Sequence, residues 1–192
     1  MLMDRPELLE SKFRQALPYE AFVARGEAQG HRGPWDQRYA ATALSDGQHA
    51  LVAGFSRKMH VLCLTGTWCG DCALQGSAMQ RVAEANPERI ELRFLLREEE
   101  HAELIVPARI NGGFRVPVTW WLAEDFAPVW CFGDRTLSRY RSMARKAFGD
   151  DAVVAPPPAD PVLAVRDEVV AQFERVHLLL RLSGRLRQKH GD

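Results

Sequence analysis

Two stretches in the middle of the chain have the apolar patterns of β-strands. Residues 60–65 form a short run of β-prone apolar side chains, which is typical of a buried strand. Residues 90–95 alternate between apolar and polar side chains, as a strand with one buried face does. Between them, residues 72–85 have the apolar spacing of a helix. The order strand, helix, strand favours two parallel strands joined by a helical crossover.

A hairpin and a further helix follow this unit. The sequence predicts a helix over about 99–108, then strands over 116–122 and 128–132 that lie close enough to pair. A helix with regularly spaced apolar side chains comes next, and we expect Asp134 to cap its start and Gly149 to lie just after its end. Because the strands of a hairpin are antiparallel, we predict an α/β fold with a mixed central sheet and helices on both faces.

The composition divides the chain into a central domain and two extensions. Residues 1–34 contain prolines and glycines that break them into short helices, which we expect to pack on the flank of the domain. Residues 35–150 form the domain, which begins with a helix over about 36–53. Residues 151–160 are a stiff, proline-rich linker. Residues 161–192 are predicted to form one long helix.

The broad apolar face of the C-terminal helix has three interpretations. We expect the helix to pack back on the domain, because such a face needs to be buried. The alternatives are a contact with a partner protein or a second copy in a homodimer, and the binding of the basic end of the helix to an anionic surface.

Composition and charge exclude several classes of protein. Of the 192 residues, 46% are hydrophobic and 26% charged, as in a soluble globular protein. The 25 basic and 25 acidic side chains cancel, which gives no support for binding to nucleic acid or to an anionic membrane. No apolar run approaches the roughly 20 residues that span a bilayer. The first residues lack the apolar region of a signal peptide, so we expect a cytoplasmic protein.

Two of the four cysteines are placed for redox chemistry. Cys69 and Cys72 form a Cys-x-x-Cys pair directly after a predicted strand and at the start of a predicted helix. Free N–H groups and the helix dipole stabilise a thiolate there, and such positions lower a thiol pKa from about 8.5 to roughly 3.5–7.5. We therefore expect Cys69 to be the exposed nucleophile and Cys72 the buried thiol that resolves a mixed disulfide.

The residues alone leave other uses of this pair open. A zinc site needs about four ligands, and Cys63 and Cys131 would complete one only if the fold brought them close. An iron–sulfur cluster shared between two chains and a purely structural disulfide are further alternatives. We interpret Cys63 and Cys131 as core residues, with a third redox thiol as the alternative for Cys63, and we predict no bound metal.

The residues around the pair resemble the thioredoxin superfamily over about 35–150. The whole chain is similar to a bacterial subgroup of stand-alone thioredoxin-like proteins, and the resemblance implies a thioredoxin-like mixed sheet flanked by helices. In that family a tryptophan precedes the first cysteine, as Trp68 does here. The matching segments are residues 60–65, Trp68-Cys69-Gly70-Asp71-Cys72, Val116-Pro117-Val118 and Phe132-Gly133-Asp134.

The resemblance also implies roles and partners. The peptide bond before Pro117 is implied to be cis, with this proline facing the dithiol and the Val116 backbone pairing with substrate. The implied activity is thiol–disulfide exchange on disulfide-containing proteins or small thiols, with a reductase or small thiol as electron donor. The Cys69–Cys72 pair carries the two electrons, so no cofactor is needed. The alternative is a binding or scaffold module whose dithiol is a redox sensor or a remnant.

Three positions depart from the family pattern. Cys63 stands where thioredoxins usually carry a buried aspartate that assists proton transfer, which argues against fast general reduction. Asp71 replaces the usual proline, and we expect its carboxylate to repel a thiolate and raise the pKa of Cys69. Arg115 precedes Val116 where a small residue is common; it is either a solvated surface arginine or a residue of the substrate groove that favours acidic partners.

Overall fold

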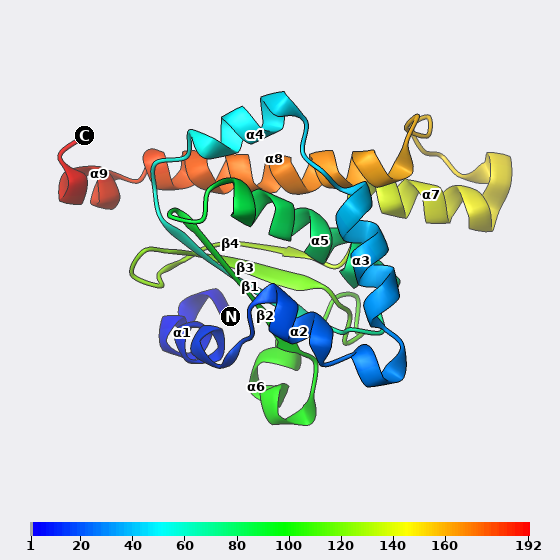
Figure 1. Ribbon diagram of the computed structural model, residues 1–192, viewed down its shortest axis with the longest axis horizontal. Helices are drawn as coiled ribbons and strands as arrows, with labels where there is room; N and C mark the ends of the chain where they lie inside the picture. The colour runs from blue at the N-terminus through cyan, green and yellow to red at the C-terminus, as the bar shows by residue number, and fades with distance from the viewer. Residues whose placement is uncertain (1) are drawn as a thin grey trace.

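A four-stranded mixed sheet lies at the centre of the computed structural model (Figure 1). The structure describes residues 2–192; Met1, the first residue of the expected N-terminal extension, lies outside the described residues. In space the strands follow the order β2-β1-β3-β4, with β1 parallel to β2 and antiparallel to β3, and β3 antiparallel to β4. The mixed sheet predicted from the sequence is therefore confirmed. The strands are β1 (Met59–Thr65), β2 (Ile90–Leu96), β3 (Val118–Ala123) and β4 (Pro128–Gly133).

Helices cover both faces of this sheet (Figure 1). Residues 2–192 also contain short 3₁₀ turns before and between the α-helices: η1 (Leu2–Asp4), η2 (Glu27–Gln29), η3 (Glu99–His101) and η4 (Gly149–Asp151). No helix among residues 2–192 is long and apolar enough to cross a membrane. The α-helices are α1 (Pro6–Gln15), α2 (Tyr19–Ala24), α3 (Arg32–Ala41), α4 (Asp46–Ala53), α5 (Gly70–Ala85), α6 (Ala102–Ile105), α7 (Leu137–Phe148), α8 (Pro161–Arg181) and α9 (Gly184–His190).

One face of the sheet packs against α5 and α8 (Figure 1). The hydroxyl of Thr119 on β3 donates to the sulfur of Met79 on α5 at 3.8 Å. On α8, Phe173 is fully buried, and its ring meets the ring of Trp121 on β3 edge to face, with centroids 5.5 Å apart. α8 therefore packs back on the domain, as we expected from its apolar face.

The N-terminal helices pack on the flank of the sheet, also as expected. Phe13 of α1 is buried against the ring of His60 on β1, with centroids 5.0 Å apart. Leu17, between α1 and α2, exchanges two backbone hydrogen bonds of 2.8 and 2.7 Å with Phe94 on β2. This short antiparallel bridge ties the N-terminal segment to the outer edge of β2.

Two predicted long helices are each broken in the structure, because a serine caps a new helix inside them. The predicted helix over 36–53 is α3 and α4, separated at Ser45. The Ser45 hydroxyl accepts from the N–H of Gln48 at 3.3 Å, and the Gln48 side chain accepts from the N–H of Ser45 at 3.1 Å. The predicted C-terminal helix ends at Arg181, and Ser183 caps the separate helix α9.

Two other predicted helix boundaries are also wrong. The helix predicted over 99–108 is the short turn η3 followed by α6, which ends at Ile105. The cap of α7 is not Asp134, because Thr136 is its N-cap residue. The first N–H groups of α7 are satisfied from another helix, since the Glu168 carboxylate of α8 accepts from the backbone of Leu137 and Ser138 at 2.7 and 2.8 Å.

Candidate active site

The two cysteines of the Cys-x-x-Cys pair lie close together where β1 leads into α5. Cys69 is the N-cap residue of α5, and its sulfur accepts a hydrogen bond from the backbone N–H of Cys72 at 3.3 Å. Cys69 is half-buried, whereas Cys72 is fully buried. One thiol is therefore accessible and its neighbour, one turn into the helix, is enclosed.

These surroundings separate the pKa values of the two thiols. The hydrogen bond from the Cys72 thiol is the largest cause that lowers the pKa of Cys69 to about 7, and the backbone N–H of Cys72 adds to it. Burial of the sulfur and the charge of Asp71 act in the opposite direction. Burial raises the pKa of Cys72 well above its ordinary value. Because the thiolate is the nucleophilic form, Cys69 is the thiol prepared to react near neutral pH.

Val116, the residue before Pro117, lies next to Cys69. The Val116–Pro117 peptide bond is cis, as the resemblance implied. The Cys69 sulfur lies 3.8 Å from the Val116 carbonyl oxygen, within hydrogen-bonding range of a thiol. β3 begins at Val118 rather than at Val116. The pairing of the Val116 backbone with a substrate stays a prediction.

The loop before Cys69 is held by residues that the sequence patterns did not single out. The buried Trp35 of α3 donates its indole N–H to the carbonyl of Thr67 at 2.8 Å, and a ring nitrogen of His31 lies 3.0 Å from the Thr67 hydroxyl. Trp68 is 54% exposed, and the guanidinium of Arg97 lies 5.0 Å from the centre of one of its rings. No motif in the sequence connects Trp35 or His31 with the cysteine pair.

Asp71 is bound by two arginines, Arg135 just before α7 and Arg139 in the first turn of α7. Arg135 donates its Nε–H to one carboxylate oxygen at 2.6 Å, and Arg139 donates its Nε–H to the other, also at 2.6 Å. These two positive charges lie close to the carboxylate that repels a Cys69 thiolate, so they weaken that repulsion. The sequence indicated the direction of the Asp71 effect but not its partners. The four-residue spacing of the two arginines, next to a helix start, was the one available signal.

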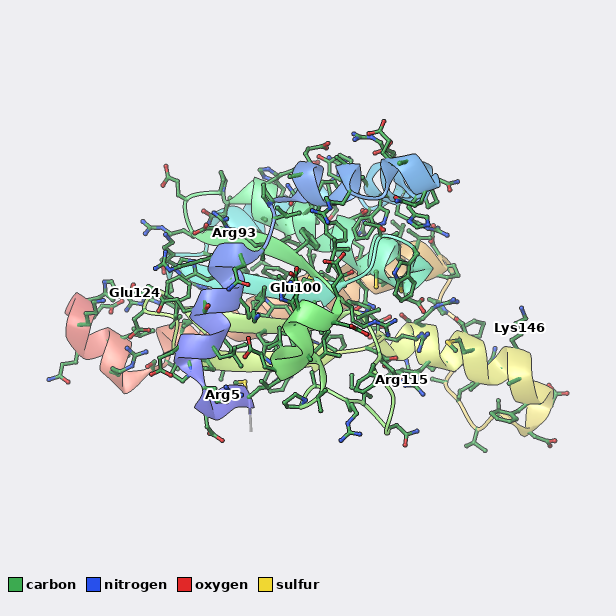
Figure 2. The ribbon with its side chains drawn as sticks, turned by 90° about the horizontal axis from the view of Figure 1, so that it is seen from below. Arg5, Arg93, Glu100, Arg115, Glu124 and Lys146 are labelled. Carbon is green, nitrogen blue, oxygen red and sulfur yellow. The ribbon has the colours of Figure 1, made fainter. Side chains whose placement is uncertain are left out.

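Asp134 is a buried acceptor in the same group of side chains. It is 1% exposed and accepts from Arg135 at 2.8 Å, from Arg115 at 3.4 Å and from the Tyr140 hydroxyl. Burial acts to raise the pKa of Asp134, but these donors outweigh it, so the pKa is lowered. Arg115 lies at the end of the sheet next to α7 (Figure 2) and is paired with this carboxylate.

An open cleft of about 490 Å³ lies beside Cys69. Its walls come from α3, the start of α5, α7 and the start of α8. Three arginines, Arg38, Arg135 and Arg139, line it together with the Asp71 carboxylate. Arg115, which we considered as a groove residue, does not line it. The cleft therefore joins the accessible thiol to a basic surface.

The other two cysteines are not members of the pair, although the charge of Cys69 is one of the causes that raise the pKa of Cys63. Cys63 is fully buried in β1 as predicted, and burial raises its pKa to about 12. Cys131 is exposed, so its interpretation as a core residue is wrong. It lies on the outermost strand, β4. The neighbouring Trp130 faces α8 and donates its indole N–H to the Gln172 side chain of that helix at 3.0 Å. Residues 2–192 contain no group of three or more histidine, cysteine, aspartate or glutamate residues that could hold a metal ion.

Comparison with known proteins identifies the family of the chain. A family model described as thioredoxin matches residues 16–145, which is more than half of the chain. The chain belongs to the thioredoxin family. The match begins inside the expected N-terminal extension, so α2 is part of the matched region, while α8 lies outside it. No curated protein matches the chain.

Two solved structures share the thioredoxin-like fold. A protein of unknown function from Pseudomonas aeruginosa is 20% identical, with a TM-score of 0.60, and the match covers 85% of this chain and 95% of that one. An HIV epitope scaffold is 19% identical, with a TM-score of 0.61, and the match covers 86% of this chain and 97% of that one. At these identities the likeness establishes the fold alone.

Proposed function

We propose that the protein is a thiol–disulfide oxidoreductase that uses Cys69 and Cys72 to reduce or exchange disulfides. The observation that carries this proposal is the state of the Cys69 sulfur. It accepts the N–H of Cys72 at 3.3 Å at the start of α5, and its pKa is lowered to about 7. The buried Cys72, with its raised pKa, stays protonated until the mixed disulfide has formed. Two neighbouring thiols with separated pKa values suit a two-step exchange.

The reaction balances without a bound cofactor. The Cys69 thiolate attacks one sulfur of a substrate disulfide, which forms a mixed disulfide and releases the first substrate thiolate. Cys72 then loses its proton and attacks the Cys69 sulfur, which releases the second thiolate and leaves a Cys69–Cys72 disulfide. Two electrons pass from the protein dithiol to the substrate. A reductase or a small thiol must return them, as we expect in a reducing cytoplasm.

The surroundings support this assignment and give it limits. The Val116 carbonyl borders the Cys69 sulfur, which suits the backbone at Val116 to hold that of a disulfide-containing protein substrate. Cys63 stays a neutral thiol because burial raises its pKa to about 12, so it does not replace a carboxylate as a proton acceptor. We therefore expect slower release of the mixed disulfide than a site with a buried aspartate would give.

An insulin-reduction assay with dithiothreitol tests the proposal. The wild-type protein should accelerate insulin precipitation, and Cys69→Ser should reduce the rate to that of dithiothreitol alone. Cys131→Ser is the matched control, because it removes another accessible cysteine outside the pair and should keep the wild-type rate. Equal rates for wild type and Cys69→Ser, with both proteins folded by circular dichroism, would reject the proposal.

A binding module is the second candidate, and one observation favours it. Leu178, Leu179 and Leu182 are exposed on or just after the end of α8, which leaves an apolar strip beside the buried face of that helix. Deleting residues 156–192 would also remove the buried Phe173, so a surface change is the better test. A cellular phenotype that survives Cys69→Ser but is lost in Leu178→Ser/Leu182→Ser would favour the module.

A further inference from the structure

We propose that the cleft beside Cys69 binds a carboxylate of a small disulfide, so that the protein prefers acidic low-molecular-weight disulfides as substrates. This inference rests on the proposed function and names its substrate class. The proposal is supported by the excess of positive charge in the cleft, by guanidinium N–H groups that have no partner in the described part of the chain, and by the position and volume of the cleft.

The charges in the cleft do not balance. Arg38, Arg135 and Arg139 line it with a single carboxylate, that of Asp71. Each oxygen of that carboxylate already accepts one guanidinium N–H, at 2.6 Å. Arg135 shares a second carboxylate, because its Nη1 donates to Asp134 at 2.8 Å. Arg38 and Arg139 therefore supply the positive charge that remains available to a ligand.

Donor groups are also left over on these two arginines. Arg139 binds Asp71 through Nε alone, and within residues 2–192 its two Nη groups have no hydrogen-bond partner; its side chain is 45% exposed. Arg38 is half-buried at the edge of the cleft, and its side chain has no ion pair or hydrogen bond within the same residues. Guanidinium groups bind carboxylates in a two-pronged geometry that a point charge does not offer.

The position of the cleft suits one half of a small disulfide. Trp68, Cys69 and Asp71 line it, whereas Val116 and Pro117 do not. A disulfide attacked by Cys69 therefore has room for one half beside Val116 and for the other half in the cleft. The volume of about 490 Å³ lies in the range of small-molecule sites. Val162 and Val165 of α8 give the cleft an apolar wall against which short methylene chains can pack.

The test uses three disulfides that differ in their end groups: dithiodipropionate, which is anionic, hydroxyethyl disulfide, which is neutral, and cystamine, which is cationic. Reduced protein, freed of reductant, is mixed with an excess of each. The second-order rate constant for loss of the Cys69 and Cys72 thiols is measured by acid quenching and thiol labelling. Within one variant, the ratio of the anionic to the neutral rate constant cancels changes in Cys69 reactivity.

Arg38→Gln should lower the ratio of anionic to neutral rate constants by about tenfold, and Arg139→Gln should lower it by a similar factor. With the wild-type protein, cystamine should react no faster than hydroxyethyl disulfide. Arg89→Gln is the matched control, because Arg89 is exposed at the opposite end of the sheet and should leave the ratio unchanged. Added salt should lower the wild-type ratio, since it screens exposed charges.

Several outcomes would overturn the inference. An unchanged ratio in Arg38→Gln and Arg139→Gln would mean that the cleft does not bind the carboxylate. An equal loss of insulin reduction in Arg38→Gln would mean that the cleft serves acidic protein segments instead. Failure of the proposed function looks different, because hydroxyethyl disulfide would then oxidise wild type no faster than Cys69→Ser.

Discussion

Two open clefts of similar volume lie at opposite ends of the sheet, and only one of them has the features of a reactive site. The cleft beside Cys69, at the end of β1, measures about 490 Å³, and the cleft beside His60, at the start of β1, about 470 Å³. Figure 2 shows the two ends, with Arg115 near α7 at one end and Glu124 beside α9 at the other. Size therefore does not distinguish the two clefts.

Every charged side chain that lines the His60 cleft has an ion-pair partner. Glu91 lies 3.0 Å from Arg93, 3.2 Å from His60 and 3.9 Å from Lys58. Glu124 binds Lys189 of α9 at 2.5 Å. At the Cys69 end, three arginines share the cleft with one carboxylate, and a thiol with a lowered pKa lies at its edge. The Cys69 cleft is therefore distinguished by guanidinium donors that are unpaired among residues 2–192, beside a thiol of lowered pKa, and not by its volume.

The largest expected effect is the loss of turnover when the buried thiol, Cys72, is removed and the accessible thiol, Cys69, is kept. Cys72→Ser should keep the attacking thiolate but lose the thiol that resolves the mixed disulfide. Turnover in the insulin assay should fall to the dithiothreitol background, while a covalent adduct with a disulfide substrate accumulates and is seen by intact-protein mass spectrometry. The double variant Cys69→Ser/Cys72→Ser should form no adduct. An adduct in the double variant would show that another cysteine attacks.

A second prediction concerns the helix that runs between the two ends. α8 lines the Cys69 cleft with its start and leads into α9 at the other end (Figure 1). Phe173→Ala removes a fully buried ring in its middle and should lower the free energy of unfolding by about 3–5 kcal/mol. Urea denaturation measures this. Phe173→Leu keeps most of the side-chain volume and should lower the free energy of unfolding clearly less. Equal losses in the two variants would argue against tight packing of Phe173 on Trp121.

A third prediction compares one carboxylate from each end. The alkylation rate of Cys69 by iodoacetamide should rise with pH through about 7, as the thiolate forms. Asp71→Asn removes a charge that raises this pKa, so the curve should move to lower pH. The shift should be less than about 1 unit, because Asp71 is one of the smaller causes that act on this pKa. Glu124→Gln should leave the curve in place. A shift to higher pH in Asp71→Asn would contradict the assigned sign.

The smallest expected effect is on stability, from the ion pairs of Glu124 at the His60 end of the sheet. The hydrogen bond from Lys189 is the main cause that lowers the pKa of Glu124 below its ordinary 4.5. A lowered carboxyl pKa adds stability above 4.5, and that stability is lost as the pH falls through the folded-state value. Glu124→Gln should therefore cost at most about 1 kcal/mol at pH 7, and less in acid. Urea denaturation at several pH values checks this, and a cost that grows in acid would contradict it.

The sequence indicated the strands and the cysteine pair because both are local signals. The apolar run before Cys69 predicts a strand that the structure places at residues 59–65, and the spacing of Cys69 and Cys72 places both at a helix start. Helix boundaries were less well predicted. Ser45 and Ser183 each start a new helix inside an apolar pattern that continues past them, so periodicity alone does not reveal the break.

Cys131 and Asp134 were misjudged because their surroundings come from distant segments. Cys131 has apolar neighbours in sequence, yet it is exposed on the outermost strand. Asp134 precedes a helix as a cap would, yet it is a buried acceptor for Arg115, Arg135 and Tyr140. Neither outcome follows from hydrophobicity or spacing, because both depend on which elements pack beside the residue.

By itself the sequence determined the class of the fold and the position of the Cys69–Cys72 pair at the start of a helix. Strand patterns, helix starts and motif spacing are properties of neighbouring residues. Only the tertiary structure decided the electrostatic surroundings of Cys69. It brought Arg38 from α3, Arg135 and Arg139 from the start of α7, and the wall of α8 to one cleft. Charges act through space over a few ångströms, and residues 38, 71 and 139 become neighbours only once the chain has folded.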